Sequence, residues 1–250
     1  MPRTVRLLPP SIQVNTAVTT YNPRIIDTVL FDLDGTLADT APDMTSALNE
    51  LLCEQGRKPL PFDMVRNQVS RGAAGVLRVA FGVDLADAEL ESLRERFLQL
   101  YAANLCVETC VFPGMHEVLA HIEALGSKWG VVTNKPAWLT DRLIEALGLT
   151  ARAACVISGD TTDQKKPHPK PLLHACACCG VEAERCVYIG DDPRDIQAAK
   201  AAGMAGLVAL YGYIGEEQDP YAWGADGVLE DIAELPIWLR LASTYKGATG

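Results

Sequence analysis

The sequence predicts a doubly wound, Rossmann-like α/β fold with a parallel sheet and an inserted α-helical domain. Six short runs rich in Val, Ile and Leu alternate with amphipathic segments along the 250 residues. The runs are almost continuously apolar, as strands covered on both faces tend to be, and the segments between them suit crossover helices. About a hundred residues separate the first two runs, far more than one crossover requires, and this gap predicts the insertion.

The individual elements follow from these patterns. The expected strands are residues 28–31, 129–133, 154–157, 186–189, 206–210 and 227–229. The expected crossover helices are 114–125, 137–147, 169–179 and 193–202. Inside the insertion, apolar residues recur at helical spacing and predict helices near 42–55, 63–69, 73–80 and 87–104, with no strand. We expect a catalytic core of residues 27–40 and 111–242, a helical cap of 41–110, a disordered extension of 1–26 and a flexible tail of 243–250.

Composition and charge narrow the functional classes. Hydrophobic residues make up 48% of the chain and charged residues 22%, which is enough to fill a core. The net charge of −10 repels phosphate backbones and anionic lipid surfaces, and no apolar run is as long as a membrane helix. Eight cysteines are too few for a disulfide scaffold. We therefore expect a cytoplasmic monomer or homodimer that acts on a small molecule and binds neither nucleic acid nor membrane.

Three of the cysteines cluster in one predicted helix. Cys176, Cys178 and Cys179 lie in an apolar run that lacks paired C-x-x-C knuckles. This setting favours core thiols over metal ligands.

The strongest local signal is a pair of carboxylates after the first strand. Asp32 and Asp34 point to the same side, at the sheet edge where ligands of open α/β folds bind. Like charges held close together raise one pKa or recruit a cation. The pair therefore predicts either acid–base machinery or half of a metal site, and a solvated Asp-Gly turn is the structural alternative.

A second acidic group follows the fourth strand. Asp192 makes a good helix N-cap before a proline and Asp195 a good first-turn acid, whereas capping does not require Asp191. Together with Asp32 and Asp34, Asp191 would supply the oxygen ligands that Mg²⁺ favours. We predict that Asp191 binds the metal and that Asp192 and Asp195 support or cap the site.

Two further strand ends carry groups suited to phosphate. Thr133 and Asn134 follow the second strand, and Lys165 and Lys166 enter the same edge from a loop. A hydroxyl, free N–H groups at a helix start and a lysine together bind distributed negative charge. Each group alone has an ordinary explanation as a cap or solvated loop, but their occurrence at successive strand ends favours a phosphate site.

In their order and spacing, these motifs resemble those of the haloacid dehalogenase superfamily. They are Asp-Leu-Asp-Gly-Thr at 32–36, Val-Thr-Asn at 132–134, Lys-Pro-His-Pro at 166–169 and Gly-Asp-Asp at 190–192. Within that superfamily the chain is similar to phosphatases with a helical cap. Residues 165–169 and 195–203 resemble phosphoglycolate phosphatases, whereas 190–195, 211–214 and 223–226 resemble N-acetylmuramic acid 6-phosphate phosphatases.

The resemblance implies a role for each motif residue. Asp32 would form an aspartyl-phosphate, and Asp34 would protonate the leaving alcohol and then activate water. Thr133 would join Lys166 in catalysis, and Gly35 and Asn134 would bind substrate. Mg²⁺ would be held by Asp32, the Asp34 carbonyl and Asp191, with Asp195 reached through water.

The resemblance also implies the reaction. The expected substrate is 2-phosphoglycolate, with N-acetylmuramic acid 6-phosphate as the alternative. A phosphosugar mutase is a further alternative, because mutases of this branch retain both acids, Asp32 and Asp34. A scaffold protein without catalytic activity is the alternative that is not an enzyme.

The cap is expected to select the substrate. Arg71, in a Gly-containing turn, could bind a substrate carboxylate, or it could be a solvated arginine at a helix end. We expect Trp138 and Tyr213 to be packing residues.

Overall fold

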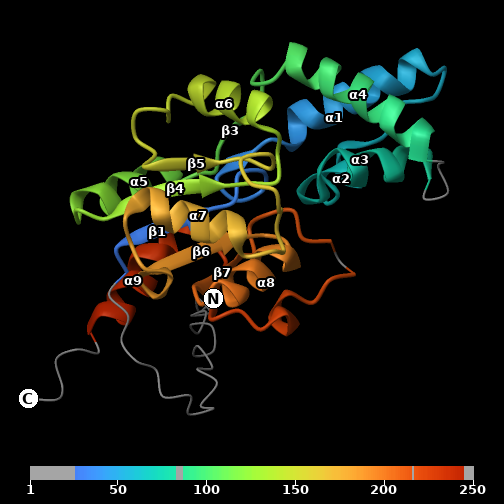
Figure 1. The fold of residues 1–250 in the computed structure, drawn as a ribbon. Helices are drawn as coiled ribbons and strands as arrows, with labels where there is room; N and C mark the ends of the chain where they lie inside the picture. Colours follow the sequence, from blue (N-terminus) through green and yellow to red (C-terminus); the bar gives the residue numbers. More distant parts are fainter. Residues whose placement is uncertain (1–25, 83–86, 216, 245–250) are drawn as a thin grey trace, which may run out of the picture.

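The computed structural model describes residues 26–82, 87–215 and 217–244, and its centre is a parallel sheet of six strands (Figure 1). The strands are β1 Thr28–Phe31, β4 Lys128–Val132, β5 Cys155–Ile157, β6 Cys186–Gly190, β7 Ala205–Ala209 and β8 Gly227–Leu229. Their spatial order is β5-β4-β1-β6-β7-β8, and every neighbouring pair is parallel. Each boundary differs from the predicted one by no more than one residue, so the doubly wound α/β prediction is confirmed.

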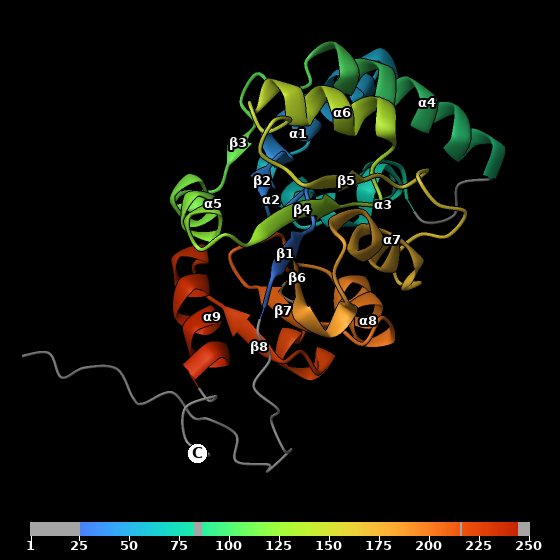
Figure 2. The same cartoon turned by 60° about the vertical axis from the view of Figure 1, so that its left-hand side comes forward.

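Helices cover both faces of this sheet (Figure 2). One face is covered by α5 Met115–Ala124, α6 Ala137–Ala146 and α9 Leu235–Thr244, and the other by α7 Lys170–Cys179 and α8 Pro193–Ala201. Successive side chains of β1 point to opposite faces: Val29 and Phe31 belong to the first core and Leu30 to the second. The last helix, α9, was not predicted.

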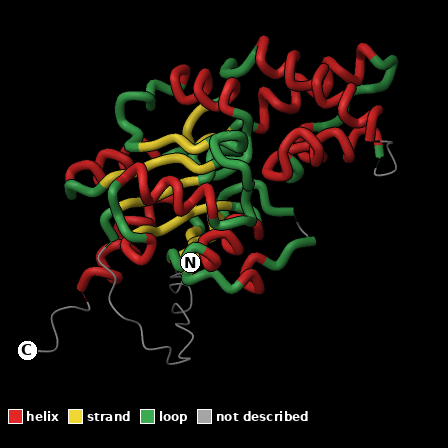
Figure 3. Tube along the Cα trace, viewed as in Figure 1, coloured by secondary structure: helices red, strands yellow, loops and turns green. Residues whose placement is uncertain are grey.

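The segment 41–110, called the cap from here on, carries four α-helices in its described parts, 41–82 and 87–110. They are α1 Ala41–Glu54, α2 Phe62–Arg66, α3 Gly72–Phe81 and α4 Asp87–Ala103. Figure 3 shows them as a helical layer to one side of the strands. A short antiparallel pair, β2 Ala38–Asp39 and β3 Cys110–Val111, joins the cap to the sheet domain. This pair was not predicted, because two-residue strands give no periodic signal.

Short 3-10 turns complete the described elements. They are η1 Val69–Arg71, η2 Ala183–Arg185, η3 Pro220–Trp223 and η4 Ile232–Glu234. The turn η1 lies between α2 and α3 in the cap and bears on the site described below.

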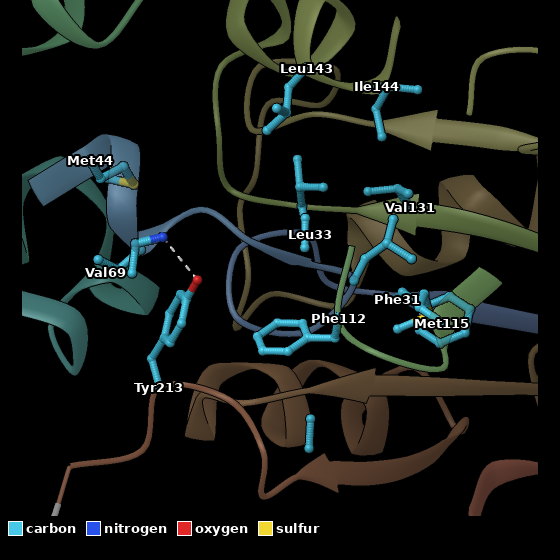
Figure 4. Close-up of a cluster of buried hydrophobic side chains, with 14 of the residues drawn as sticks. Phe31, Leu33, Met44, Val69, Phe112, Met115, Val131, Leu143, Ile144 and Tyr213 are labelled. Carbon is cyan, nitrogen blue, oxygen red and sulfur yellow. Dashed lines mark hydrogen bonds between the residues drawn. The ribbon is translucent and has the colours of Figure 1, made fainter. Parts of the chain in front are cut away.

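Two polar anchors fix the points where the chain enters and leaves the cap. The Tyr213 hydroxyl accepts hydrogen bonds from the Thr40 and Ala41 N–H groups at 2.7 and 3.0 Å and donates to Asp39 Oδ1 at 2.6 Å. Figure 4 shows this hydroxyl pointing to the start of α1. Buried Asp43 accepts bonds from three successive N–H groups, at residues 107–109. The prediction that Tyr213 is a packing residue is confirmed, since its side chain is buried.

The cysteines of α7 divide between core and surface. Cys176 and Cys179 are buried and lie with their sulfur atoms 3.6 Å from those of Cys186 and Cys155, respectively. The core-thiol prediction is therefore right for these two, but wrong for Cys178, which is exposed on the outer side of the helix.

Two predictions concern the chain ends and membranes. Residues 1–25 and 245–250, which make up most of the expected extension and tail, lie outside the described residues. Within the described part, none of the helices combines the length and the apolarity needed to span a bilayer.

Candidate active site

Three buried carboxylates gather at the carboxyl edge of the sheet. Asp32 follows β1, Asp191 follows β6, and Asp195 lies in the first turn of α8. One oxygen from each lies within 4.8 Å of the other two. The parallel register of β1 and β6 pairs Phe31 with Ile189, which brings the residues that follow these strands side by side. The edge is also where the strand order changes direction beside β1, the usual ligand position in such sheets.

This cluster differs in one member from the carboxylate set that the residues alone had suggested. Asp195 occupies it, and the Asp34 side chain does not. Asp195 combines two roles here, because its Oδ2 also accepts from the Asp192 N–H in a capping box at the start of α8. The predicted N-cap role of Asp192 is confirmed by the bond that its side chain accepts from the Arg194 N–H.

Lys166 is the cation at the centre of the acids. Its Nζ lies 2.8 Å from both Asp32 Oδ1 and Asp195 Oδ1, and it donates to the Tyr188 hydroxyl at 2.7 Å. Burial opposes the charge on Lys166, but the Asp195 and Asp32 carboxylates outweigh it and raise the lysine's pKa. Lys166 is therefore protonated throughout the physiological range.

The carboxyl group of Asp32 carries the opposite perturbation. Burial raises its pKa to about 7, because the Lys166 charge compensates only part of the lost solvation and Asp195 adds repulsion. Its Oδ1 accepts from the Leu33 N–H at 2.7 Å and from Lys166. Among the described residues no donor is bonded to Oδ2, so this oxygen is the one available for chemistry or for a cation.

Asp191 is held by donors from three parts of the chain. Its Oδ2 accepts from the Ser70 hydroxyl of the cap at 2.6 Å and from the Tyr213 N–H at 2.8 Å, and its Oδ1 accepts from the Thr36 hydroxyl at 3.4 Å. Burial, followed by repulsion from Asp32, raises the pKa of Asp191 well above its usual value.

Glycine is required next to this carboxylate. Gly35 has a φ of +83°, and a Cβ at this position would lie 2.1 Å from Asp191 Oδ2. The turn after β1 therefore keeps its backbone directly against the acid cluster.

The donor set fits a divalent cation. Three acids lie close together, and the single charge of Lys166 leaves the pKa values of Asp32 and Asp191 raised. A hard cation with oxygen ligands would relieve this repulsion. The Asp32 and Asp191 carboxylates, with Asp195 close by, could hold it.

Asp34 is turned toward a second lysine that the sequence reading did not assign. Asp34 Oδ1 lies 2.7 Å from both the Lys135 Nζ and the Thr40 hydroxyl oxygen. Lys135 also donates to the Tyr101 hydroxyl at 3.2 Å and lies over the Tyr101 ring, 4.6 Å from its centroid. Since Tyr101 belongs to α4, this chain of contacts joins the acid of the core to the cap. Its only sequence signal was the position of Lys135, next to Thr133 and Asn134.

The two residues after β4 have different roles: Thr133 lines the cavity, and the Asn134 side chain holds a loop in place. The Thr133 hydroxyl oxygen accepts from the Lys135 N–H at 3.2 Å, and Thr133 lines the cavity described below. The Asn134 side chain bonds to both the N–H and the carbonyl of Lys166, at 3.0 Å each. Asn134 thus fixes the Lys166 loop with its side chain, while Lys165 is exposed beside it.

A cavity of about 230 Å³ connects these groups beneath the cap. Its floor includes Asp32, Asp34, Thr133 and Lys166, and its roof includes Arg71 and Ala73 of the cap. The Arg71 side chain is 45% exposed and makes a 3.5 Å ion pair with Glu217. Such exposed pairs contribute little to stability, so Arg71 can exchange this partner for another anion. Arg194, which the sequence reading also left unassigned, reaches up from α8 and donates to the Ser70 carbonyl at 2.8 Å.

Fold and site together define a doubly wound α/β protein with a helical cap over an acidic site: buried acids and two lysines meet at the carboxyl edge of a parallel sheet, under an inserted helical segment. The chain belongs to the haloacid dehalogenase-like hydrolase family, whose pattern matches residues 29–209. The superfamily resemblance stated from the motifs is thereby confirmed.

Named relatives fall into two groups. The chain is 46% identical to a phosphoglycolate phosphatase of Xylella fastidiosa over 214 residues, which cover 84% of this chain and 93% of that protein. It is 40% identical to an N-acetylmuramic acid 6-phosphate phosphatase of Pseudomonas aeruginosa over 207 residues, or 83% and 92% of the two chains. Among solved structures, a predicted phosphoglycolate phosphatase from Haemophilus somnus superposes with a TM-score of 0.77 at 26% identity, covering 87% of this chain and 99% of that one.

Proposed function

We propose that the protein is a Mg²⁺-dependent phosphatase that hydrolyses a small anionic phosphate monoester through an aspartyl-phosphate, with 2-phosphoglycolate as its first candidate substrate. The observation that carries the proposal is Lys166 Nζ, 2.8 Å from both Asp32 and Asp195, at the floor of a cavity roofed by the cap. A lysine among acids beside a free carboxylate oxygen suits the transfer of a phosphoryl group.

Asp32 would be the nucleophile. Its Oδ1 is engaged by Lys166 and the Leu33 N–H, which leaves Oδ2 to attack phosphorus in line with the departing alcohol. The new bond joins Oδ2 to phosphorus as the ester oxygen leaves. Lys166 would keep the nucleophile ionised and balance charge on the phosphoryl oxygens.

Asp34 would be the general acid and base. Lys135 and Thr40 both bind its Oδ1, so the carboxyl group is fixed at the cavity wall. In the first step it would give a proton to the leaving oxygen. In the second step the same carboxylate would take a proton from the water that attacks the aspartyl-phosphate, and phosphate and free Asp32 would result.

Thr133, which lines the cavity next to Asn134, would bind the phosphoryl group through its hydroxyl, and the Asn134 and Gly35 backbones would donate to the same group. Asp32, the Asp34 carbonyl and Asp191 would hold Mg²⁺, with Asp195 within reach. When bound, the cation supplies positive charge that neutralises the acids and the transferring phosphoryl group. We also propose that the cap excludes water during the first step.

The cavity walls support an acidic leaving group. Arg71, Arg94 and Arg194 line it together with the catalytic acids. Arg71 would release Glu217 and bind the carboxylate of glycolate in a bidentate pair. The relatives named as phosphoglycolate phosphatases, at 46% identity, support this substrate, whereas those named as N-acetylmuramic acid 6-phosphate phosphatases, at 40%, support the alternative. We also propose a cytoplasmic monomer or homodimer. The acidic composition supports the absence of a nucleic-acid partner, and the cysteine content supports a reducing compartment.

The decisive experiment compares kcat/KM on 2-phosphoglycolate and on N-acetylmuramic acid 6-phosphate, with Mg²⁺ and after chelation. We expect phosphate release that requires Mg²⁺ and disappears in Asp32→Asn, which should still fold. Product chromatography distinguishes hydrolysis from phosphate migration within a sugar. Metal-independent turnover, or steady hydrolysis by Asp32→Asn, would contradict the proposal.

A further inference from the structure

A second hollow adjoins the catalytic cavity, between α4 of the cap and the start of α6. Its volume is about 460 Å³, compared with about 230 Å³ for the cavity around the acids. Both spaces are bounded by Arg94, Leu98, Pro136 and Lys165. A molecule whose phosphate lies at Asp32 could therefore extend past these four residues into the outer hollow.

One wall of the outer hollow is an exposed tryptophan. Trp138 lies in the first turn of α6 and is 47% exposed, although α6 buries Leu139 and Leu143 on its other side. The expectation that Trp138 is a packing residue is thus wrong, because the core face of α6 is already filled without it. Exposure of an indole ring to water is unfavourable, so covering it with the apolar face of a ligand stabilises the complex.

Polar side chains surround this indole. Glu95 and Gln99 of α4 and Asp160 from the loop after β5 line the same hollow. The Asp160 carboxylate is fixed beside α6, because its Oδ1 accepts from the Ala137 N–H at 2.9 Å. An aromatic face with carboxylate and amide groups at its edges matches a sugar ring, which offers C–H groups on its face and hydroxyl groups at its rim.

The charges change sign along the path from the outer hollow to the cavity. Arg94 and Lys165 lie at the shared boundary, whereas Glu95 and Asp160 lie further out. Glu91 of the same hollow pairs with Arg94 at 2.9 Å, which leaves Lys165 as the unpaired cation of the boundary among the described residues. A negative substituent would be attracted to the boundary and repelled from the outer hollow. The outer hollow therefore favours uncharged hydroxyl or amide groups, and the boundary favours a carboxylate.

We infer that the outer hollow is a leaving-group subsite that binds the hydroxylated ring of a phosphorylated sugar acid by stacking on Trp138. This inference rests on the proposed phosphatase function and deepens it by assigning a binding residue to the leaving group of the alternative substrate. A two-carbon acid such as glycolate ends before the subsite, so the same enzyme would hydrolyse it without using Trp138.

The test compares Trp138→Ala and Trp138→Phe on both candidate substrates with Mg²⁺. We expect Trp138→Ala to lower kcat/KM for N-acetylmuramic acid 6-phosphate about tenfold, mostly through KM, while kcat/KM for 2-phosphoglycolate stays within about twofold. Trp138→Phe should keep most of the sugar-acid activity. Tyr221→Ala removes another exposed aromatic ring, outside the hollow, and should change neither value. Equal losses on both substrates, or an unchanged sugar-acid value in Trp138→Ala, would overturn the inference.

A binding measurement separates failure of the subsite from failure of the proposed function. In the Asp32→Asn background, calorimetry with N-acetylmuramic acid 6-phosphate should show weaker binding when Trp138→Ala is added, whether or not the wild type turns this compound over. Equal binding with and without the Trp138 substitution would overturn the subsite and leave the phosphatase proposal intact. The binding measurement thus tests the Trp138 subsite, and the hydrolysis assay separately tests the proposed function.

Discussion

The Ser70 hydroxyl of the cap donates a hydrogen bond to Asp191 Oδ2, with 2.6 Å between the two oxygens. Asp191 is the candidate metal ligand that follows β6, so this bond joins the cap directly to the acid cluster. Arg194 strengthens the connection, because its guanidinium donates to the Ser70 carbonyl at 2.8 Å while also pairing with Asp192. The orientation of the Asp191 carboxylate and the closed position of η1 therefore depend on each other.

Replacing the Ser70 hydroxyl should weaken the metal site. We expect Ser70→Ala to raise the Mg²⁺ concentration for half-maximal activity by about tenfold, since a hydrogen bond to a charged group contributes about 1.5–3 kcal/mol. Coupling between two sites is reciprocal, so saturating Mg²⁺ should also favour the closed cap, measured as slower proteolysis of the cap. Ser70→Thr keeps the hydroxyl and is the matched control. A Mg²⁺ titration of Ser70→Ala that superimposes on the wild type would show that the bond has no such role.

The assignment of Asp34 predicts a dependence on the leaving group. Asp34→Asn should slow hydrolysis of an alkyl phosphate by about a hundredfold or more, because the alcohol then leaves without a proton. The loss should be much smaller with p-nitrophenyl phosphate, whose leaving group is stable as an anion. Asp141→Asn, an exposed acid on α6, serves as the charge control. Equal losses on both esters would remove the acid role from Asp34.

The raised carboxyl pKa values predict how the metal-free protein responds to pH. An Asp whose pKa is higher in the folded than in the unfolded state stabilises the fold below its ordinary pKa and loses that contribution as pH rises through the folded value. For Asp32 this window runs from 3.8 to about 7, and Asp191 shifts in the same direction. Lys166 contributes nothing here, because its raised pKa lies above the window.

The melting temperature in the presence of a chelator should therefore fall between pH 5 and pH 8. The slope should be smaller in Asp32→Asn, which cannot ionise at that position, and smaller again with Mg²⁺, which replaces the proton as the counter-charge. A melting temperature that rises with pH in the metal-free protein would contradict the assigned direction of both pKa shifts.

The catalytic edge was predictable because each of its groups follows an apolar run. Asp32, Thr133 and Asp191 each stand one residue after a strand, and parallel strands end at a common edge. The choice of Asp195 over the Asp34 carboxylate was not predictable, since it depends on side-chain direction after the Gly35 turn.

Contacts between cap and core were the part that sequence reasoning missed. Tyr101 has the helical spacing of a core residue and is buried, yet its hydroxyl binds Lys135 at 3.2 Å. Trp138 stands next to apolar Leu139, yet it faces the outer hollow. In both cases local periodicity gave the helix correctly, but the partner lies far along the chain and left no periodic trace.

The last prediction concerns the cysteines of α7, for which the thiol pKa and the solvent exposure predict opposite orders of reactivity. The hydrogen bond between Cys179 and Cys155 lowers the pKa of the Cys179 thiol to about 7 against the effect of burial, so ionisation alone would make Cys179 the more reactive thiol of these two. Cys179 is only 2% exposed, however, whereas Cys178 is exposed. Because a buried thiol reacts only when the helix opens locally, we expect access to decide.

Alkylation at neutral pH, followed by peptide mass spectrometry, should therefore label Cys178 early together with exposed Cys53 and Cys110. Cys179 should be labelled only at denaturant concentrations that loosen α7 from the sheet. Cys178→Ser removes the early label from the α7 peptide and serves as the control for peptide assignment. Labelling of Cys179 in the folded protein as fast as that of Cys178 would mean that α7 opens freely, and that its thiols do not belong to a closed core.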